Sequence, residues 1–104
     1  MSASLPFLIA LTIRVHLPDN GSLKGKRKEL LSIRAALARR FGASVAEVDD
    51  QDLWQRATLA AGIVGRSAGE LDHAADGVER YLMSRCTGGV TIERKLLSFG
   101  DLED

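Results

Sequence analysis

The segment Phe7–Leu17, FLIALTIRVHL, constrains the fold more than any other part of the chain because it alternates with a period of two. All its odd-numbered residues are apolar, whereas Thr12, Arg14 and His16 lie at even-numbered positions. Successive side chains of a strand point to opposite faces of a sheet, so this pattern predicts a half-buried strand. The polar interruptions also leave the segment short of the ~20 apolar residues that a membrane-spanning helix needs.

Two helices are expected from apolar residues at helical spacing. The first covers residues 23–40, with Ser22 as its N-cap and Gly42 as its end. The second begins at Ser67, which stands three residues before Glu70, the spacing of a capping box. Further strands are expected over residues 43–48, 56–65 and 90–98.

The resulting order, βαββαβ, predicts an α+β, ferredoxin-like fold. We expect a four-stranded antiparallel sheet in strand order 4-1-3-2 with two helices on one face. Residues 1–104 then form a single domain whose ends, 1–6 and 99–104, are expected to fray. The topology brings three segments to one end of the sheet: PDNGSLKGKRK, DDQDLW and SRCTGG.

Composition and charge limit the classes of function. The chain has 104 residues and no net charge, which argues against indiscriminate nucleic-acid binding. The charge is uneven, however: residues 1–42 hold eight Lys/Arg and two Asp/Glu, and residues 43–104 hold six and twelve. A single cysteine, Cys86, cannot form an internal disulfide, and the N-terminus lacks the features of a signal peptide. We therefore expect a cytoplasmic protein.

The segment SVAEVDDQDLWQR crowds carboxylates, including Glu47, Asp49 and Asp52, into a short hairpin. Their spacing does not match an EF-hand calcium loop, and a short hairpin loop offers no cavity for an acid–base pair. We expect a structural role, in which Asp49 or Asp52 caps backbone N–H groups. Arg56 is expected to pair across the hairpin with Glu47 or Asp49.

The chain's only tryptophan, Trp54, follows these carboxylates. We expect its ring to be buried between the hairpin and the start of the first helix, near Leu23 and Arg27. Truncation of such a buried ring would cost ~3–5 kcal/mol.

A basic run occupies the first turns of the expected first helix, where the helix dipole disfavours cations. Cations at a helix start are locally unfavourable, so their presence there indicates a functional site. Helix N-termini also bind phosphate. The alternative is that these cations pair with the acidic hairpin, and both can hold. The candidate anion- or RNA-binding residues are Arg14, Lys24, Lys26, Arg27 and Lys28.

Other functional signals are weak. His16 and His73 show no metal-ligand spacing, so we expect neither a metal nor another cofactor. The five aromatic residues avoid the middle of the open sheet face, so we expect any RNA contact to be mainly with phosphate. Small residues on that face, including Ala10, Ala60 and Gly62, are compatible with a homodimer.

Two motifs resemble those of the YlxP-like family, small bacterial proteins with a domain of unknown function. They are S-L-K-x-K-R at Ser22–Arg27 and V-A-E-V-D-x-Q-D-L-W-Q-R at Val45–Arg56. The resemblance covers most of the chain. It implies a ferredoxin-like fold and, because members are encoded beside ribosome-maturation genes, a link to ribosomal RNA.

Our leading hypothesis is a non-enzymatic accessory factor that binds RNA or a ribosomal particle through the basic helix start. The alternative is a protein–protein adaptor or homodimer scaffold that uses the open sheet face. A more remote alternative is an acylphosphatase-like hydrolase, although PDNGSLKGKR does not resemble the phosphate loop of those enzymes.

Overall fold

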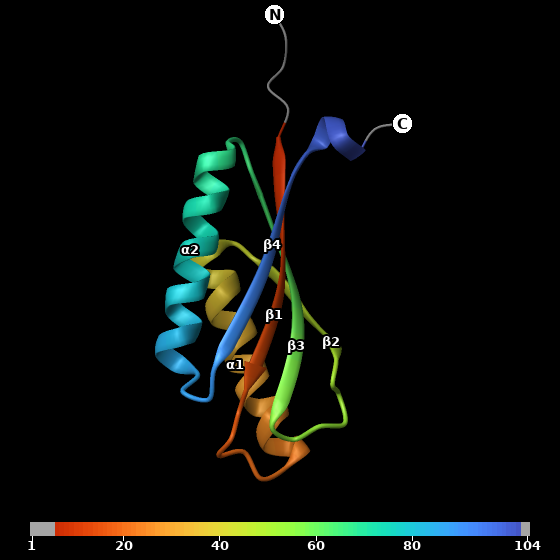
Figure 1. Ribbon diagram of the computed structural model, residues 1–104, viewed down its shortest axis with the longest axis vertical. Coiled ribbons are helices and arrows are strands. Elements are labelled where there is room, and N and C mark those ends of the chain that lie inside the picture. The colour runs from red at the N-terminus through yellow and green to blue at the C-terminus, as the bar shows by residue number, and fades with distance from the viewer. Residues whose placement is uncertain (1–5, 103–104) are drawn as a thin grey trace, which may run out of the picture.

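The computed structural model describes residues 6–102, and its elements follow the expected order (Figure 1). The four strands are β1 (Phe7–His16), β2 (Ser44–Asp49), β3 (Arg56–Gly65) and β4 (Val90–Ser98). The helices are α1 (Leu23–Phe41) and α2 (Ala68–Arg85), followed by the short 3-10 helix η1 (Phe99–Leu102).

The strands form one antiparallel sheet in the order β2-β3-β1-β4, and both helices lie on the same side of it (Figure 1). This confirms the expected strand order and the ferredoxin-like α+β fold. The long β1–β3 pairing runs without interruption from Phe7–Gly65 to His16–Arg56.

The period of two in β1 decides which face carries the core. Ile9, Leu11, Ile13 and Val15 are fully buried beneath the helices. They join the inward-facing residues of the neighbouring elements, chiefly Leu30, Ile33 and Leu37 of α1, Ala57, Leu59, Ala61 and Ile63 of β3, and Leu71, Ala75, Val78 and Leu82 of α2. Burial of these apolar side chains is the main favourable term in folding.

Local signals fix the ends of the helices. The Ser22 and Ser67 hydroxyls accept hydrogen bonds from the backbone N–H groups of Gly25 and Glu70, at 3.0 and 3.1 Å. Gly42 ends α1 in the left-handed conformation, with φ of 67°. These contacts satisfy backbone groups that the helices leave free, as the sequence predicted.

Three loops meet at one end of the sheet, which we call the loop end and define as residues 17–22, 50–55 and 86–89. Leu17 N donates to Gln55 O at 2.7 Å, and His16 N donates to Gly89 O at 3.0 Å. The Gln55 side chain donates to Pro18 O at 3.1 Å. The convergence expected from topology is therefore confirmed.

The opposite end of the sheet carries residues that we expected to fray. Residues 99–102 instead form η1, in which Asp101 accepts a hydrogen bond from Ser98 N at 2.9 Å. Phe99 N also donates to Pro6 O at 2.9 Å. The remaining expected frayed positions, residues 1–5 and 103–104, lie outside the described residues.

Gly42 and Gly69 provide a test of the α1 C-cap, because a methyl group at either position meets open space. Gly42→Ala should destabilise the protein by ~1–2 kcal/mol, since only Gly42 holds the left-handed conformation. Gly69→Ala should leave stability unchanged or raise it by up to ~1 kcal/mol. Urea denaturation of both variants tests this expectation, and equal losses would contradict it.

Candidate functional site

Lys26 is the most deeply buried charged residue of the described chain, with 1% of its surface exposed. It projects from the first turns of α1 toward the β2–β3 hairpin. Its ammonium group donates to the carbonyl oxygens of Asp50 and Leu53, the latter at 2.8 Å. It also lies 2.8 Å from Glu47 Oε2. The first helix and the hairpin loop are thus tied together by one buried cation.

The Lys26 contacts compensate a large desolvation cost, because a buried ammonium loses its water shell. Two carbonyls and one carboxylate replace that water. Glu47 Oε2 accepts no well-aligned hydrogen bond from the described residues, so its contact with Lys26 is best understood as an ion pair. The Glu47 carboxylate is three-quarters buried, which strengthens its attraction to Lys26 relative to a surface pair.

The other carboxylates at the start of the hairpin loop also have structural partners. Asp50 adopts a left-handed backbone conformation, with φ of 63°. Its side chain accepts a hydrogen bond from the Thr58 hydroxyl at 2.8 Å, while Asp49 Oδ1 accepts one from Asp50 N at 2.8 Å. These contacts bear out the backbone-capping role expected for Asp49. They also hold the loop in the conformation that presents its carbonyls to Lys26.

Asn20 links the first loop to the same hairpin. Its side-chain amide donates to Ser22 O at 2.7 Å and to Trp54 O. A Cβ atom at Gly25 would overlap the Asn20 side chain, so the glycine permits this close approach. The backbone of the hairpin loop is therefore held from two sides, by Asn20 and by Lys26.

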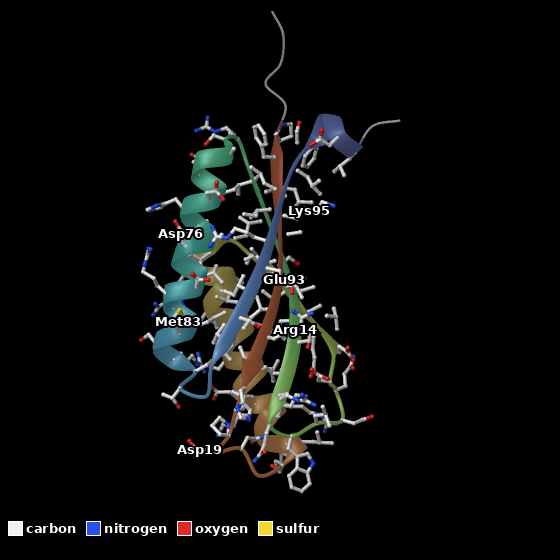
Figure 2. All side chains as sticks on the ribbon, viewed as in Figure 1. Arg14, Asp19, Asp76, Met83, Glu93 and Lys95 are labelled. Atoms are coloured by element: carbon white, nitrogen blue, oxygen red, sulfur yellow. The ribbon has the colours of Figure 1, made fainter. Side chains whose placement is uncertain are left out.

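The five candidate basic residues do not form one surface. Lys26 is buried, as the alternative of pairing with the acidic hairpin predicted, and it is not accessible to RNA. Arg14 lies on the open face of the sheet, across the sheet from the helices, and pairs with Glu93 at 2.7 Å (Figure 2). Lys24, Arg27 and Lys28 are exposed on the first turns of α1.

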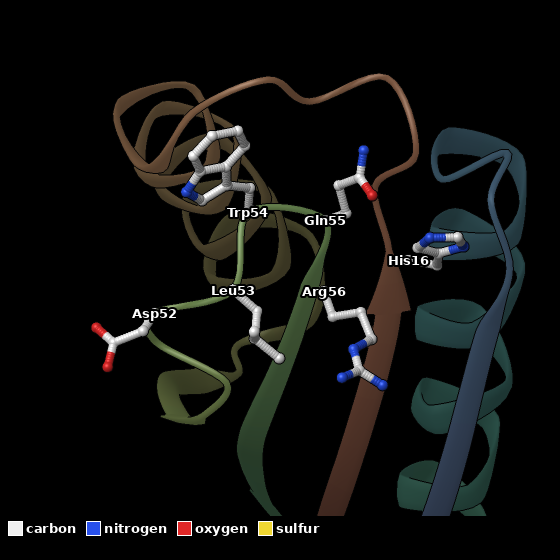
Figure 3. Close-up of a pocket in the computed structure, with 6 residues that line it drawn as sticks. All are labelled: His16, Asp52, Leu53, Trp54, Gln55 and Arg56. Carbon is white, nitrogen blue, oxygen red and sulfur yellow. The ribbon is translucent and has the colours of Figure 1, made fainter.

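The expected burial of Trp54 is wrong, because 53% of its surface is exposed. The space between the hairpin and the helix start is occupied by the Lys26 side chain. The carbonyl groups of Leu53 and Trp54 turn toward Lys26 and Asn20. The loop therefore faces the helix with its backbone, and the indole points outward (Figure 3).

The expected pairing of Arg56 with Glu47 or Asp49 is also wrong. Glu47 lies opposite the core residue Leu59 and faces the helices, where Lys26 binds it. Arg56 immediately precedes the core residue Ala57, so it lies on the open face. The sheet thus separates Arg56 from Glu47.

Arg56 and Trp54 instead line an open hollow of about 590 Å³ at the loop end (Figure 3). We call it the Trp54 hollow; its lining residues are His16, Asp52, Leu53, Trp54, Gln55 and Arg56. Among the described residues, Arg56 has no carboxylate within ion-pair distance. The Asp52 carboxylate points away from the other side chains (Figure 3). The hollow therefore combines an exposed indole, a guanidinium, an imidazole and an amide.

The sequence reasoning did not assign His16 or Gln55 to a site. A usable signal was the antiparallel register between β1 and β3, which places His16 directly opposite Arg56. Because both residues lie on the open face, their side chains are cross-strand neighbours. The position of Trp54, by contrast, depended on the loop conformation, which strand periodicity does not determine.

A smaller hollow of about 270 Å³ lies between the first loop and the end of α2. Cys86 borders it but is buried, and burial together with the nearby Glu29 carboxylate raises the pKa of its thiol. A raised pKa leaves less of the reactive thiolate.

Among residues 6–102, no group of three or more His, Cys, Asp or Glu side chains is placed to hold a metal ion. No helix in the same range is long and apolar enough to cross a membrane.

The chain belongs to the family described as "Protein of unknown function (DUF503)", whose model matches residues 8–94. No curated protein matches it. Among solved structures, it is similar to the de novo designed protein Foldit4, with 11% identity and a TM-score of 0.57 over 88% of this chain and 96% of that one. This identity is too low to show more than a shared fold.

Two other structures are more distant. The designed protein Ferredog-Diesel matches at 18% identity over 83% of both chains, with a TM-score of 0.40. An amidase of the hydantoinase/carbamoylase family from Burkholderia phymatum matches at 12% identity, with a TM-score of 0.46 over 90% of this chain and 28% of that one.

Lys26 and Lys28 form a matched pair for testing the buried ion pair. Lys26→Met should destabilise the protein by ~3–5 kcal/mol, because it leaves Glu47 and two loop carbonyls without their cation. Lys28→Met removes an exposed charge and should change stability by less than ~0.5 kcal/mol. Urea denaturation measures both effects.

A second substitution separates the charge from the packing at this position. Lys26→Met combined with Glu47→Met should recover part of the lost stability, because the carboxylate is no longer left without its partner. If Lys26→Met and Lys28→Met unfold at the same urea concentration, the cation does not stabilise the loop end.

Proposed function

We propose that this protein is an RNA-binding accessory factor whose contact surface is the Trp54 hollow together with the exposed start of α1. The observation that carries the proposal is the exposed Trp54 ring beside Arg56, which has no ion-pair partner in the described chain. This differs from the hypothesis drawn from the sequence, which relied on the basic helix start alone.

The indole supports a contact with an unpaired base. Every nucleobase has a flat π face, and stacking on an aromatic side chain contributes ~1–3 kcal/mol per base without requiring a particular sequence. Trp54 is positioned by backbone hydrogen bonds on both sides, from Lys26 to Leu53 O and from Asn20 to Trp54 O. The backbone that carries the indole is therefore already ordered, so the loop loses little conformational entropy when a base stacks on the ring.

The cations of the loop end support contacts with phosphate. The planar guanidinium of Arg56 has five N–H donors and can bind two oxygens of a phosphate at once. Lys24 and Lys28 are four residues apart, so they lie on the same side of α1, which begins at this end of the molecule. An RNA strand that crosses the loop end can therefore meet a stacking ring first and a row of cations next.

The resemblance to the YlxP-like family supports ribosomal RNA, or a ribosomal particle, as the physiological target. The same resemblance supports a bacterial origin, and the single cysteine supports a reduced, cytoplasmic location. The chemistry of the hollow is in keeping with binding: its one carboxylate, Asp52, points away from the other lining groups (Figure 3).

Trp54→Ala should weaken binding of a fluorescently labelled single-stranded RNA by roughly 5- to 100-fold, as expected for the loss of one stacked base. Because the ring is half exposed, urea denaturation should show much less than the ~3–5 kcal/mol loss typical of a buried aromatic. Leu31→Ala is the matched control, since Leu31 is an exposed apolar residue (65%) outside the Trp54 hollow. Equal affinity of the two variants would contradict the stacking role.

The salt dependence of binding tests the phosphate contacts. Each phosphate neutralised on a single strand contributes a slope of about −0.7 in log affinity against log salt. Arg56→Ala should reduce the magnitude of the slope by about 0.7, and Lys24→Glu with Lys28→Glu by about 1.4. The double variant should fold at least as well as the parent, because glutamates suit a helix start. Unchanged slopes would remove these residues from the interface.

A further inference from the structure

β4 forms an edge of the sheet, and no described strand pairs with its outer side. It pairs with β1 in one continuous register, from Phe7–Ser98 to Val15–Val90, without a bulge. The opposite edge strand, β2, is shorter and has a register shift between Glu47 and Asp49. Long, regular edges present unpaired N–H and C=O groups and invite another strand, whereas short or bulged edges do not.

The direction of the backbone groups along β4 follows from two hydrogen bonds. Gly89 O accepts from His16 N of β1, so odd-numbered residues turn their backbone groups toward β1. Ser98 N instead binds Asp101 Oδ2 outside the sheet. Because these directions alternate along a strand, Ile92, Arg94 and Leu96 turn their N–H and C=O groups to the free edge.

We propose that a second copy of this chain pairs with this edge, β4 against β4, in antiparallel orientation about a two-fold axis at Arg94. The two four-stranded sheets then become one eight-stranded sheet. In this register Glu93 lies opposite Lys95 of the second copy, and Lys95 lies opposite the second copy's Glu93. Glu93 also pairs with Arg14 of its own chain at 2.7 Å, so its carboxylate would lie between two cations, Arg14 and the second copy's Lys95. Figure 2 shows Glu93 and Lys95 following one another along β4.

The charges select this register from the alternatives. Centring the pairing on Arg94 overlaps Val90–Ser98 with itself. Asp101 already accepts the Ser98 N–H, so the central hydrogen bonds come from Ile92, Arg94 and Leu96. Centring it one residue earlier or later places Glu93 opposite Glu93, or Lys95 opposite Lys95, and like charges directly opposite are destabilising. Centring it between two residues places outward backbone groups against inward ones, so the ladder of hydrogen bonds cannot form.

The neighbouring side chains fit the same register. On the helix face, the exposed Leu96 (37%) lies opposite Ile92 of the second copy, and this contact buries apolar surface. The two Arg94 residues meet at the axis, but each is held by its own Asp76 at 3.0 Å and Asp72 at 3.6 Å. Their charges are therefore largely neutralised before the copies meet.

A second copy of this chain fits better than an unrelated strand, because the strand is complementary to itself. Its opposite charges lie one residue either side of the axis, so each copy supplies both members of the two ion pairs. The proposed interface is also independent of the proposed RNA surface. An antiparallel pairing places the two loop ends at opposite ends of the long sheet, so either proposal can fail without the other.

Sedimentation velocity over a range of micromolar concentrations tests the proposal with the full chain. The parent should form a species of twice the 11.2 kDa chain mass as concentration rises. Glu93→Lys and Lys95→Glu should each weaken this dimer roughly tenfold, because two attractive cross-strand pairs become repulsive. The double variant Glu93→Lys/Lys95→Glu should restore it, and an equimolar mixture of the two single variants should form a mixed dimer.

Leu96→Pro tests the backbone contact. It removes an N–H that points to the free edge, so the β1–β4 ladder should survive while the dimer is lost. Circular dichroism reports whether the variant is folded. A parent that stays monomeric at all concentrations overturns the proposal. A dimer that none of these substitutions weakens also overturns it, and the same measurement on Val64→Lys then tests the open sheet face instead.

Discussion

The buried ammonium of Lys26 is the interaction on which the loop end of this protein depends. It joins α1 to the β2–β3 hairpin through the Glu47 carboxylate and the carbonyls of Asp50 and Leu53. A lysine in this position is costly unless every donor is used, because water no longer solvates it. The loop must therefore keep the one conformation that delivers these oxygens, and the left-handed Asp50 is part of that conformation.

The exposure of Trp54 follows from the same constraint. Lys26 fills the space under the hairpin, and the loop turns its carbonyl groups inward to meet it. The adjacent indole is left on the surface beside Arg56. Glu47, Asp49 and Asp50 hold this arrangement through their contacts with Lys26, the loop backbone and Thr58. A motif dominated by carboxylates thus builds a surface suited to an anionic, aromatic partner.

The sheet separates charges that are close in sequence. Arg14 and Arg56 lie on its open face, whereas Lys26 and Glu47 lie on the helix face. The basic residues of the first 28 positions therefore cannot act as one patch. The same alternation places Glu93 and Lys95 together on the open face of β4 and sends Arg94 between them to the carboxylates of α2. Arg94 therefore makes intramolecular ion pairs, Glu93 pairs with Arg14 across the open face, and Lys95 has no carboxylate within ion-pair distance among the described residues.

The sequence by itself determined the element order, the strand order and the helix caps. These depend on local periodicity and on residues such as Ser22, Ser67 and Gly42, whose effect extends over a few neighbours. It also brought the three loops together, because topology follows from element order. Only the tertiary structure decided the roles of Lys26, Trp54 and Arg56. Either the Lys26 side chain or the Trp54 ring could have filled the space between the hairpin and the start of α1, so the two groups compete for it. That competition is settled by packing and hydrogen-bond geometry in three dimensions, which the spacing of residues along the chain does not contain.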